Sequence, residues 1–222
     1  MKQFVHLAER PEMSFGIRTE YINGKRHYIT PEGNNYPSIT TVLGELSKVN
    51  IQKWRERVGE AEANKISGKA SRRGTKLHLI CEGYIQNDST FLDGQTPDQI
   101  ELFKGIQPHL DKINNVHGVE LALYSDHFGL AGRTDLIADY DGKLSVIDYK
   151  TSSKPKKKEW CEGYFAQGSF YAVAYEELTG IPVSQVVIIM AIEQDAPQVF
   201  VEKRDDWIEK IWEAKKLYEL NN

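Results

Sequence analysis

The sequence is poor in cysteine, in net positive charge and in long apolar runs. Only two cysteines occur among its 222 residues, so a disulfide framework and a four-cysteine zinc or iron–sulfur site within one chain are excluded. No apolar run approaches the roughly 18 residues of a membrane-spanning helix, and residues 1–6 lack the apolar stretch of a signal peptide. A reducing, cytoplasmic setting without a membrane partner is the simplest interpretation.

Charge is limited overall but unevenly placed. With 28 Lys and Arg against 32 Asp and Glu, the formal net charge is −4, which argues against a protein covered with basic residues. Residues 53–76 nevertheless hold eight Lys or Arg against three Glu, and four lysines lie within residues 154–158. Such asymmetry permits a positive groove on an acidic body, although a solvated helix face and a mobile loop explain it equally well.

Apolar residues make up 40% of the chain, enough for one packed α/β domain with a modest appendage. Asn23-Gly24 predicts a hairpin over residues 21–29. Asn50 is expected to cap a helix that begins at residue 51, and Gly68 is expected to break or bend the helical region. Cap residues and apolar spacing predict helices at residues 38–46, 51–67, 69–86, 98–114, 159–179 and 205–220. Alternation and turn signals predict strands at residues 116–125, 129–140, 143–151, 183–192 and 198–203.

This order predicts an α/β (α+β) fold with a mixed central sheet. Three hairpin-linked strands followed by a helical crossover require both antiparallel and parallel pairing, with helices on the sheet faces. We expect residues 1–67 to form an N-terminal hairpin and helical extension. Residues 68–222 would then form an αβββαβ core with a C-terminal helix.

Two acidic residues interrupt otherwise apolar strands. Asp135 lies in one predicted strand, and Asp148 lies in the next, across a tight turn. Lys150 follows Asp148 by two residues, so both side chains share one sheet face. Acids in apolar strands are costly unless they are paired or bound to a metal. The set therefore indicates either a structural ion network or a site for a hard cation such as Mg²⁺ beside an ammonium group.

Several short motifs, in this order, resemble those of a known family. They are RGTKLH at residues 73–78, Glu120, GRTD at 132–135, DYK at 148–150 and QGSFY at 167–171. Together with the predicted element order, they resemble the PD-(D/E)XK nuclease superfamily, and within it the RecB-type branch that includes mitochondrial and phage exonucleases. The resemblance covers about residues 68–195. Some members of this branch hold an iron–sulfur cluster through four cysteines, which this chain lacks.

The resemblance implies roles for individual residues. The implied metal ligands, for Mg²⁺ or Mn²⁺, are His78, Asp135, Asp148 and the carbonyl of Tyr149. The implied catalytic residues are Lys150, which would orient water or stabilise charge, with Glu120, Gln167 and Tyr171. Glu120 either positions the attacking water, completes a second metal site or is simply an exposed strand acid. Gln167 and Tyr171, one helical turn apart, would reach the scissile region or a flanking phosphate.

DNA is the partner that these expectations imply, as single strands or duplex ends. Arg72, Arg73 and Lys76 would contact phosphates on the helix that carries His78. Four aromatic residues are candidate base-stacking platforms or, alternatively, core residues: Trp54, Tyr84, Tyr164 and Phe165. The resulting hypothesis is a metal-dependent DNA exonuclease. An endonuclease or junction resolvase of the same fold, and a catalytically inactive nucleic-acid-binding module, remain as alternatives.

Overall fold

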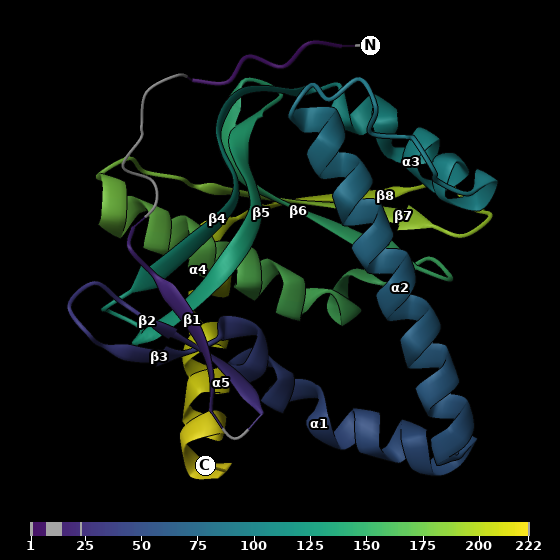
Figure 1. Cartoon of the computed structure of the whole chain (residues 1–222). Helices are drawn as coiled ribbons and strands as arrows, with labels where there is room; N and C mark the ends of the chain where they lie inside the picture. The colour runs from purple at the N-terminus through teal and green to yellow at the C-terminus, as the bar shows by residue number, and fades with distance from the viewer. Residues whose placement is uncertain (1, 8–14, 23, 222) are drawn as a thin grey trace.

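A five-stranded mixed sheet forms the centre of the computed structural model, which describes residues 2–7, 15–22 and 24–221 (Figure 1). The strands, in spatial order, are β4 (Ile113–Ser125), β5 (Leu130–Tyr140), β6 (Lys143–Ser152), β7 (Gln185–Ile192) and β8 (Gln198–Lys203). Only β6 and β7 pair in parallel, while the other neighbours are antiparallel. The predicted mixed sheet is therefore confirmed.

Helices cover both faces of this sheet. One core lies beneath α2 (Glu60–Ile85) and α3 (Pro97–Leu110), and a second lies beneath α1 (Ile39–Val58), α4 (Glu162–Thr179) and α5 (Ile208–Asn221). Alternate strand residues divide between the two cores: Leu136 and Ile147 join the first, Ile137 and Val146 the second. No helix in the described part of the chain has the length and apolarity needed to cross a bilayer.

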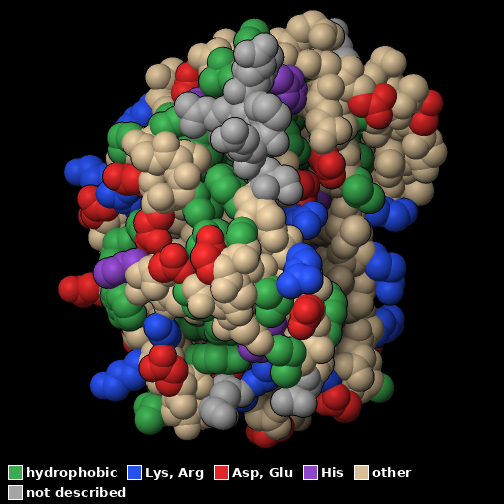
Figure 2. Space-filling view, turned by 60° about the vertical axis from the view of Figure 1, so that its left-hand side comes forward, with side chains coloured by type: hydrophobic (Ala, Val, Ile, Leu, Met, Phe, Trp, Pro, Cys, Tyr) green, Lys and Arg blue, Asp and Glu red, His purple; other side chains and the backbone are tan. Residues whose placement is uncertain are grey.

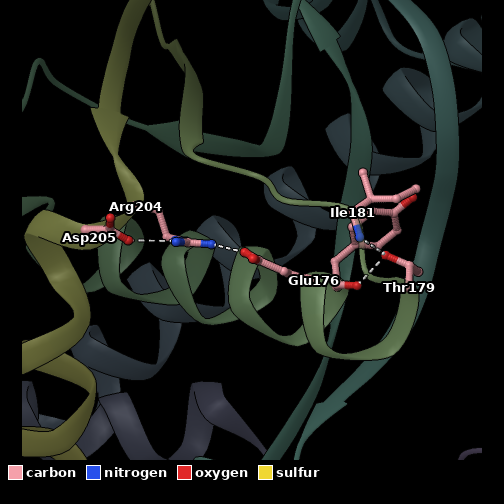
Figure 3. A network of polar contacts seen from close by, with 6 residues as sticks. Glu176, Thr179, Ile181, Arg204 and Asp205 are labelled. Atoms are coloured by element: carbon pink, nitrogen blue, oxygen red, sulfur yellow. Dashed lines mark hydrogen bonds and ion pairs between the residues drawn. The ribbon is translucent and has the colours of Figure 1, made fainter.

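The crossover helix α4 lies very close to β7 at Gly168. A Cβ atom on Gly168 would stand 2.3 Å from Val186 Cγ1, so only glycine allows this approach. Near the C-terminal end of α4, Glu176 pairs with Arg204, which also binds Asp205 through Nε at 2.7 Å (Figure 3). Gly180, at φ 72°, then ends the helix in the left-handed conformation that favours glycine. The crossover helix is thus held at its middle and at its C-terminal end.

The helix boundaries in the N-terminal half differ from those expected. The structure has two long helices that meet at Gly59, where φ is 84°, so the predicted break at Gly68 is wrong and Asn50 lies inside α1. A glycine inside a helix costs only about 1 kcal/mol, and the chain tolerates it here. The predicted domain boundary after residue 67 falls within α2, and that division stays a prediction.

Other elements differ at their ends. The helix expected to reach residue 114 stops at Leu110, since β4 begins at Ile113, and a 3₁₀ helix (Arg204–Trp207) precedes α5. A separate small sheet contains β1 (Arg18–Ile22), β2 (Lys25–Ile29) and β3 (Asn35–Pro37). Of the expected Asn-Gly turn, Asn23 lies outside the described residues. Figure 2 shows charged side chains of both signs interspersed over the face that it displays.

Candidate functional site

The ladder between β5 and β6 ends at the two acidic residues. Its last pair is Leu136 with Ile147, so Asp135 and Asp148 occupy the next opposed positions. The strands separate there, and Asp135 Oδ2 accepts the backbone N–H of Tyr149 at 2.9 Å. A side-chain carboxylate thus replaces a ladder bond, which opens a notch between the two strands.

His78 reaches this notch from α2. Its Nδ1 lies 3.4 Å from Asp135 Oδ1, and its ring meets the Tyr149 ring edge-on, with centroids 5.9 Å apart. The neighbouring residues Leu77 and Ile80 are buried in the core, which fixes the position of the helix. Burial opposes charge on both partners, yet the contact holds the pKa of Asp135 below and that of His78 above its ordinary value.

Glu120 completes a group of three potential metal ligands. One ligand atom each from His78, Glu120 and Asp135 lies within 4.8 Å of the others. Burial, and then the nearby Asp135 carboxylate, raise the pKa of Glu120. The cluster offers one imidazole nitrogen and two carboxylates, and the acidic Asp148 lies nearby. Such a set suits a hard divalent cation such as Mg²⁺ or Mn²⁺, so the residues present fit the expected ion.

The backbone of Glu120 is unusual for a strand residue. Its φ is 51°, in the left-handed region that non-glycine residues rarely adopt. Leu121 is consequently folded back against Gly118, where a Cβ atom would lie 2.3 Å from Leu121 Cδ1. Strain of this kind persists only where the surroundings hold it, and here it lies at the carboxylate that faces His78. Gly118 therefore leaves the space that the Leu121 side chain occupies next to Glu120.

We expect Gly118→Ala to lower the free energy of unfolding by about 1–3 kcal/mol, because the added methyl group overlaps the Leu121 side chain. Urea denaturation of the single variant measures this cost. The same substitution in a Leu121→Ala background should cost less, since the overlapping atoms are gone. Equal costs in the two backgrounds would show that Leu121 is not the obstacle.

Asp148 and Lys150 form an ion pair on the α4 side of the notch. The Asp148 side chain is 4% exposed and that of Lys150 is 19% exposed. Burial raises the pKa of Asp148 to about 6, although Lys150 opposes this shift. Burial alone would lower the pKa of Lys150, but Asp148 and Asp135 raise it, so the ammonium stays charged. Asp148 is not among the three clustered ligand atoms, and its role as a ligand stays a prediction.

Gln167 and Tyr171 contact each other on α4. The Gln167 Nε2 atom donates to Tyr171 Oη at 3.5 Å. The Tyr171 ring is buried against Gly132, where a Cβ atom would lie 2.8 Å from the ring and its hydroxyl. The Tyr171 ring can occupy this position only because Gly132 has no side chain. Within the described residues, no hydrogen bond or ion pair joins this pair to the three clustered ligands, so its catalytic role stays a prediction.

The expected phosphate-binding residues do not gather around His78. Arg73 pairs with Glu193 at 2.8 Å, a tie between α2 and the segment after β7. Arg72 and Lys76 are exposed, but at about 100° per residue they point roughly 120° and 160° away from His78 around the helix. Their contact with DNA stays a prediction. Glu193 was missed by sequence reasoning because 120 residues separate it from Arg73.

The aromatic candidates separate clearly in the structure. Tyr84 and Phe165 are fully buried, which agrees with the core alternative and not with stacking on bases. Trp54 is half-buried on α1. Tyr164 lies beside the site, with Lys150 Nζ 5.2 Å and Lys156 Nζ 4.9 Å from its ring centroid. Sequence reasoning named Tyr164 but missed its contact with Lys150, which no spacing rule reveals.

Comparison with known proteins agrees with this geometry. The family model described as PD-(D/E)XK nuclease superfamily matches residues 52–217. Mitochondrial genome maintenance exonuclease 1 from Mus musculus is 28% identical over 165 residues, covering 67% of this chain and 49% of that protein. The Homo sapiens protein of the same name is 27% identical over 132 residues, covering 55% and 38%. The chain thus spans about half or less of the length of these curated relatives.

Among solved structures, a candidate exonuclease from Eubacterium rectale aligns with a TM-score of 0.45 at 15% identity, covering 69% of this chain and 68% of that one.

Proposed function

Because the chain belongs to the PD-(D/E)XK nuclease superfamily, we propose that it is a divalent-metal-dependent exonuclease that hydrolyses phosphodiester bonds in DNA. The observation that carries this proposal is the notch between β5 and β6. There His78, Glu120 and Asp135 converge within 4.8 Å, and the Asp148–Lys150 pair lies alongside. Exonuclease relatives support the same reaction.

The residues divide the work by their chemistry. His78, Glu120, Asp135 and Asp148, with the Tyr149 carbonyl, would hold Mg²⁺ or Mn²⁺. When bound, such an ion supplies positive charge for a phosphodiester and acidifies water. Lys150, held in place by Asp148, donates to phosphate oxygens and stabilises the charge that develops on them. Asp135 orients His78 through the 3.4 Å contact.

A single strand with a free end is the proposed substrate. The helix α2 carries His78 across one face of the sheet. The preceding helix, α1, meets the first turn of α2 at an angle (Figure 1). A strand must pass this helical cover to reach the notch. A flexible single strand passes more readily than a stiff duplex. The cytoplasm, of the host if the chain is phage-encoded, is the proposed location.

We expect linear single-stranded DNA to be degraded with Mg²⁺ or Mn²⁺, blunt duplex more slowly, and a closed single-stranded circle hardly at all, because entry needs a free end. Incubating linear and circular forms of one DNA, each with an EDTA control, measures this. Equal loss of both forms would favour an endonuclease or junction resolvase. No loss of either, with strands still bound, would favour the inactive binding module.

A further inference from the structure

The segment between β6 and α4 (residues 153–160, the β6–α4 segment) carries a surface that the proposed reaction does not use. We propose that Trp160 is a platform on which a base of a single-stranded nucleic acid stacks, while Lys154 and Lys157 contact its backbone. This inference rests on the proposed function, because it places the strand next to the proposed active site. In this proposal, a strand approaches or leaves the notch along the β6–α4 segment.

Trp160 is the most exposed of the four tryptophans. Its exposed fraction is 64%, whereas Trp212, at 39%, packs against His127 and Phe128. Trp54 and Trp207 are only partly exposed. Single-strand binders use exposed aromatic rings as stacking platforms for bases.

Hydrogen bonds hold the β6–α4 segment in one conformation. The Gln198 side chain, on β8, forms two hydrogen bonds with the backbone of Lys156. It accepts the N–H at 2.8 Å and donates to the carbonyl oxygen at 3.0 Å. Ser152 donates to the carbonyl of Lys154 at 2.6 Å. A short 3₁₀ helix (Lys158–Trp160) then presents the ring. A surface held in this way loses little conformational entropy when it binds a strand.

Positive charge lies next to the ring. Lys157 Nζ lies 5.7 Å from the Trp160 ring centroid. Lys158 is neutralised by Glu202 at 2.7 Å, but within the described ranges no carboxylate pairs with Lys154, Lys156 or Lys157. Lysines without an acidic partner, one of them next to an exposed aromatic ring, suit a polyanion with stacking groups better than a neutral protein surface.

Two ammonium groups next to one ring link Lys156 of this segment to the notch. Lys156 Nζ donates to the Tyr164 hydroxyl at 2.8 Å and lies over the same ring. Lys150 Nζ lies 5.2 Å from the centre of that ring and pairs with Asp148. Trp160 belongs to the same segment as Lys156, four residues before Tyr164, so we place the platform beside this row, which ends at the proposed catalytic lysine.

The test measures binding of oligo(dT) and of an abasic strand of equal length, in EDTA so that nothing is cleaved. Trp160→Ala should bind oligo(dT) about tenfold more weakly, whereas Trp160→Phe, which keeps a ring, should lose far less. On the abasic strand the effect of Trp160→Ala should vanish, because no base is left to stack. Tyr21→Ala removes another exposed ring, on β1, and serves as the matched control.

The lysines have a separate readout. Lys157→Gln should flatten the dependence of log affinity on log salt by roughly 0.7, the value for one phosphate contact on a single strand. Three outcomes would each overturn the platform. They are unchanged oligo(dT) binding by Trp160→Ala, an equal loss of affinity for the abasic strand in that variant, and no strand binding by the unaltered protein. Preferential binding of an acidic peptide that competes with oligo(dT) would assign the surface to a protein partner instead.

The two proposals fail in different ways. If the unaltered protein binds oligo(dT) through Trp160 but cleaves nothing with Mg²⁺ or Mn²⁺, the platform stands and the exonuclease proposal falls. If it cleaves DNA and Trp160→Ala binds and cleaves equally well, the exonuclease stands and the platform falls.

Discussion

Asp135→Asn is expected to abolish DNA cleavage, with a loss of at least about 1000-fold in rate, while the chain still folds. The substitution removes the negative charge that faces His78 and that would contact the metal ion. An asparagine carbonyl oxygen still accepts the backbone N–H of Tyr149, so the notch keeps its shape. Cleavage of end-labelled linear single-stranded DNA with Mg²⁺ measures the effect.

The matched control is Asp139→Asn on the same strand. Asp139 accepts a hydrogen bond from Asn115 at 2.7 Å and belongs to neither the clustered ligands nor the Asp148–Lys150 pair. We expect the Asp139→Asn variant to cleave DNA at a rate near that of the unaltered protein. Circular dichroism on both variants checks that they fold. A folded Asp135→Asn variant that cleaves normally would remove the notch from consideration as the active site.

Lys150→Met is expected to reduce cleavage by about 100- to 1000-fold, because the ammonium that stabilises charge on the phosphate is lost. The same change leaves the buried Asp148 carboxylate without its partner. The free energy of unfolding should fall by about 3 kcal/mol, the lower end for breaking a buried pair, since Lys150 is 19% exposed. Urea denaturation and cleavage assays measure the two effects separately.

A double variant, Lys150→Met with Asp148→Asn, separates stability from catalysis. It removes both charges, so most of the lost stability should return while cleavage stays absent. Recovery of cleavage in the double variant would contradict the role given to Lys150. If the single variant is as stable as the unaltered protein, the buried pair does not support the fold in the way the structure indicates.

The strand order was predictable because it depends on local signals. Asp141-Gly142 marks a tight turn, and both residues have positive φ in the structure, 50° and 80°. The place where α1 and α2 meet was not predictable in this way. Gly59 and Gly68 look alike in sequence, but only Gly59 adopts a positive φ, and no local signal distinguishes the two.

The candidate site was predictable to the extent that it follows from strand alternation. The shared face of Asp148 and Lys150 comes from period-two geometry, and their ion pair agrees with it. His78 and Glu120 were placed only by family resemblance, because their approach depends on tertiary packing. The left-handed backbone of Glu120 and the Arg73–Glu193 pair are likewise products of the folded chain that local patterns do not encode.

The notch between β5 and β6 draws on both sides of the sheet. His78 is carried by a helix that packs on one core, whereas Asp148 and Lys150 face the helix that packs on the other. Local opening of either core would therefore dismantle the site before the chain unfolds globally. Catalytic competence thus requires both cores to stay closed. Activity should disappear at the temperature at which either α2 or α4 loses its protection from hydrogen exchange.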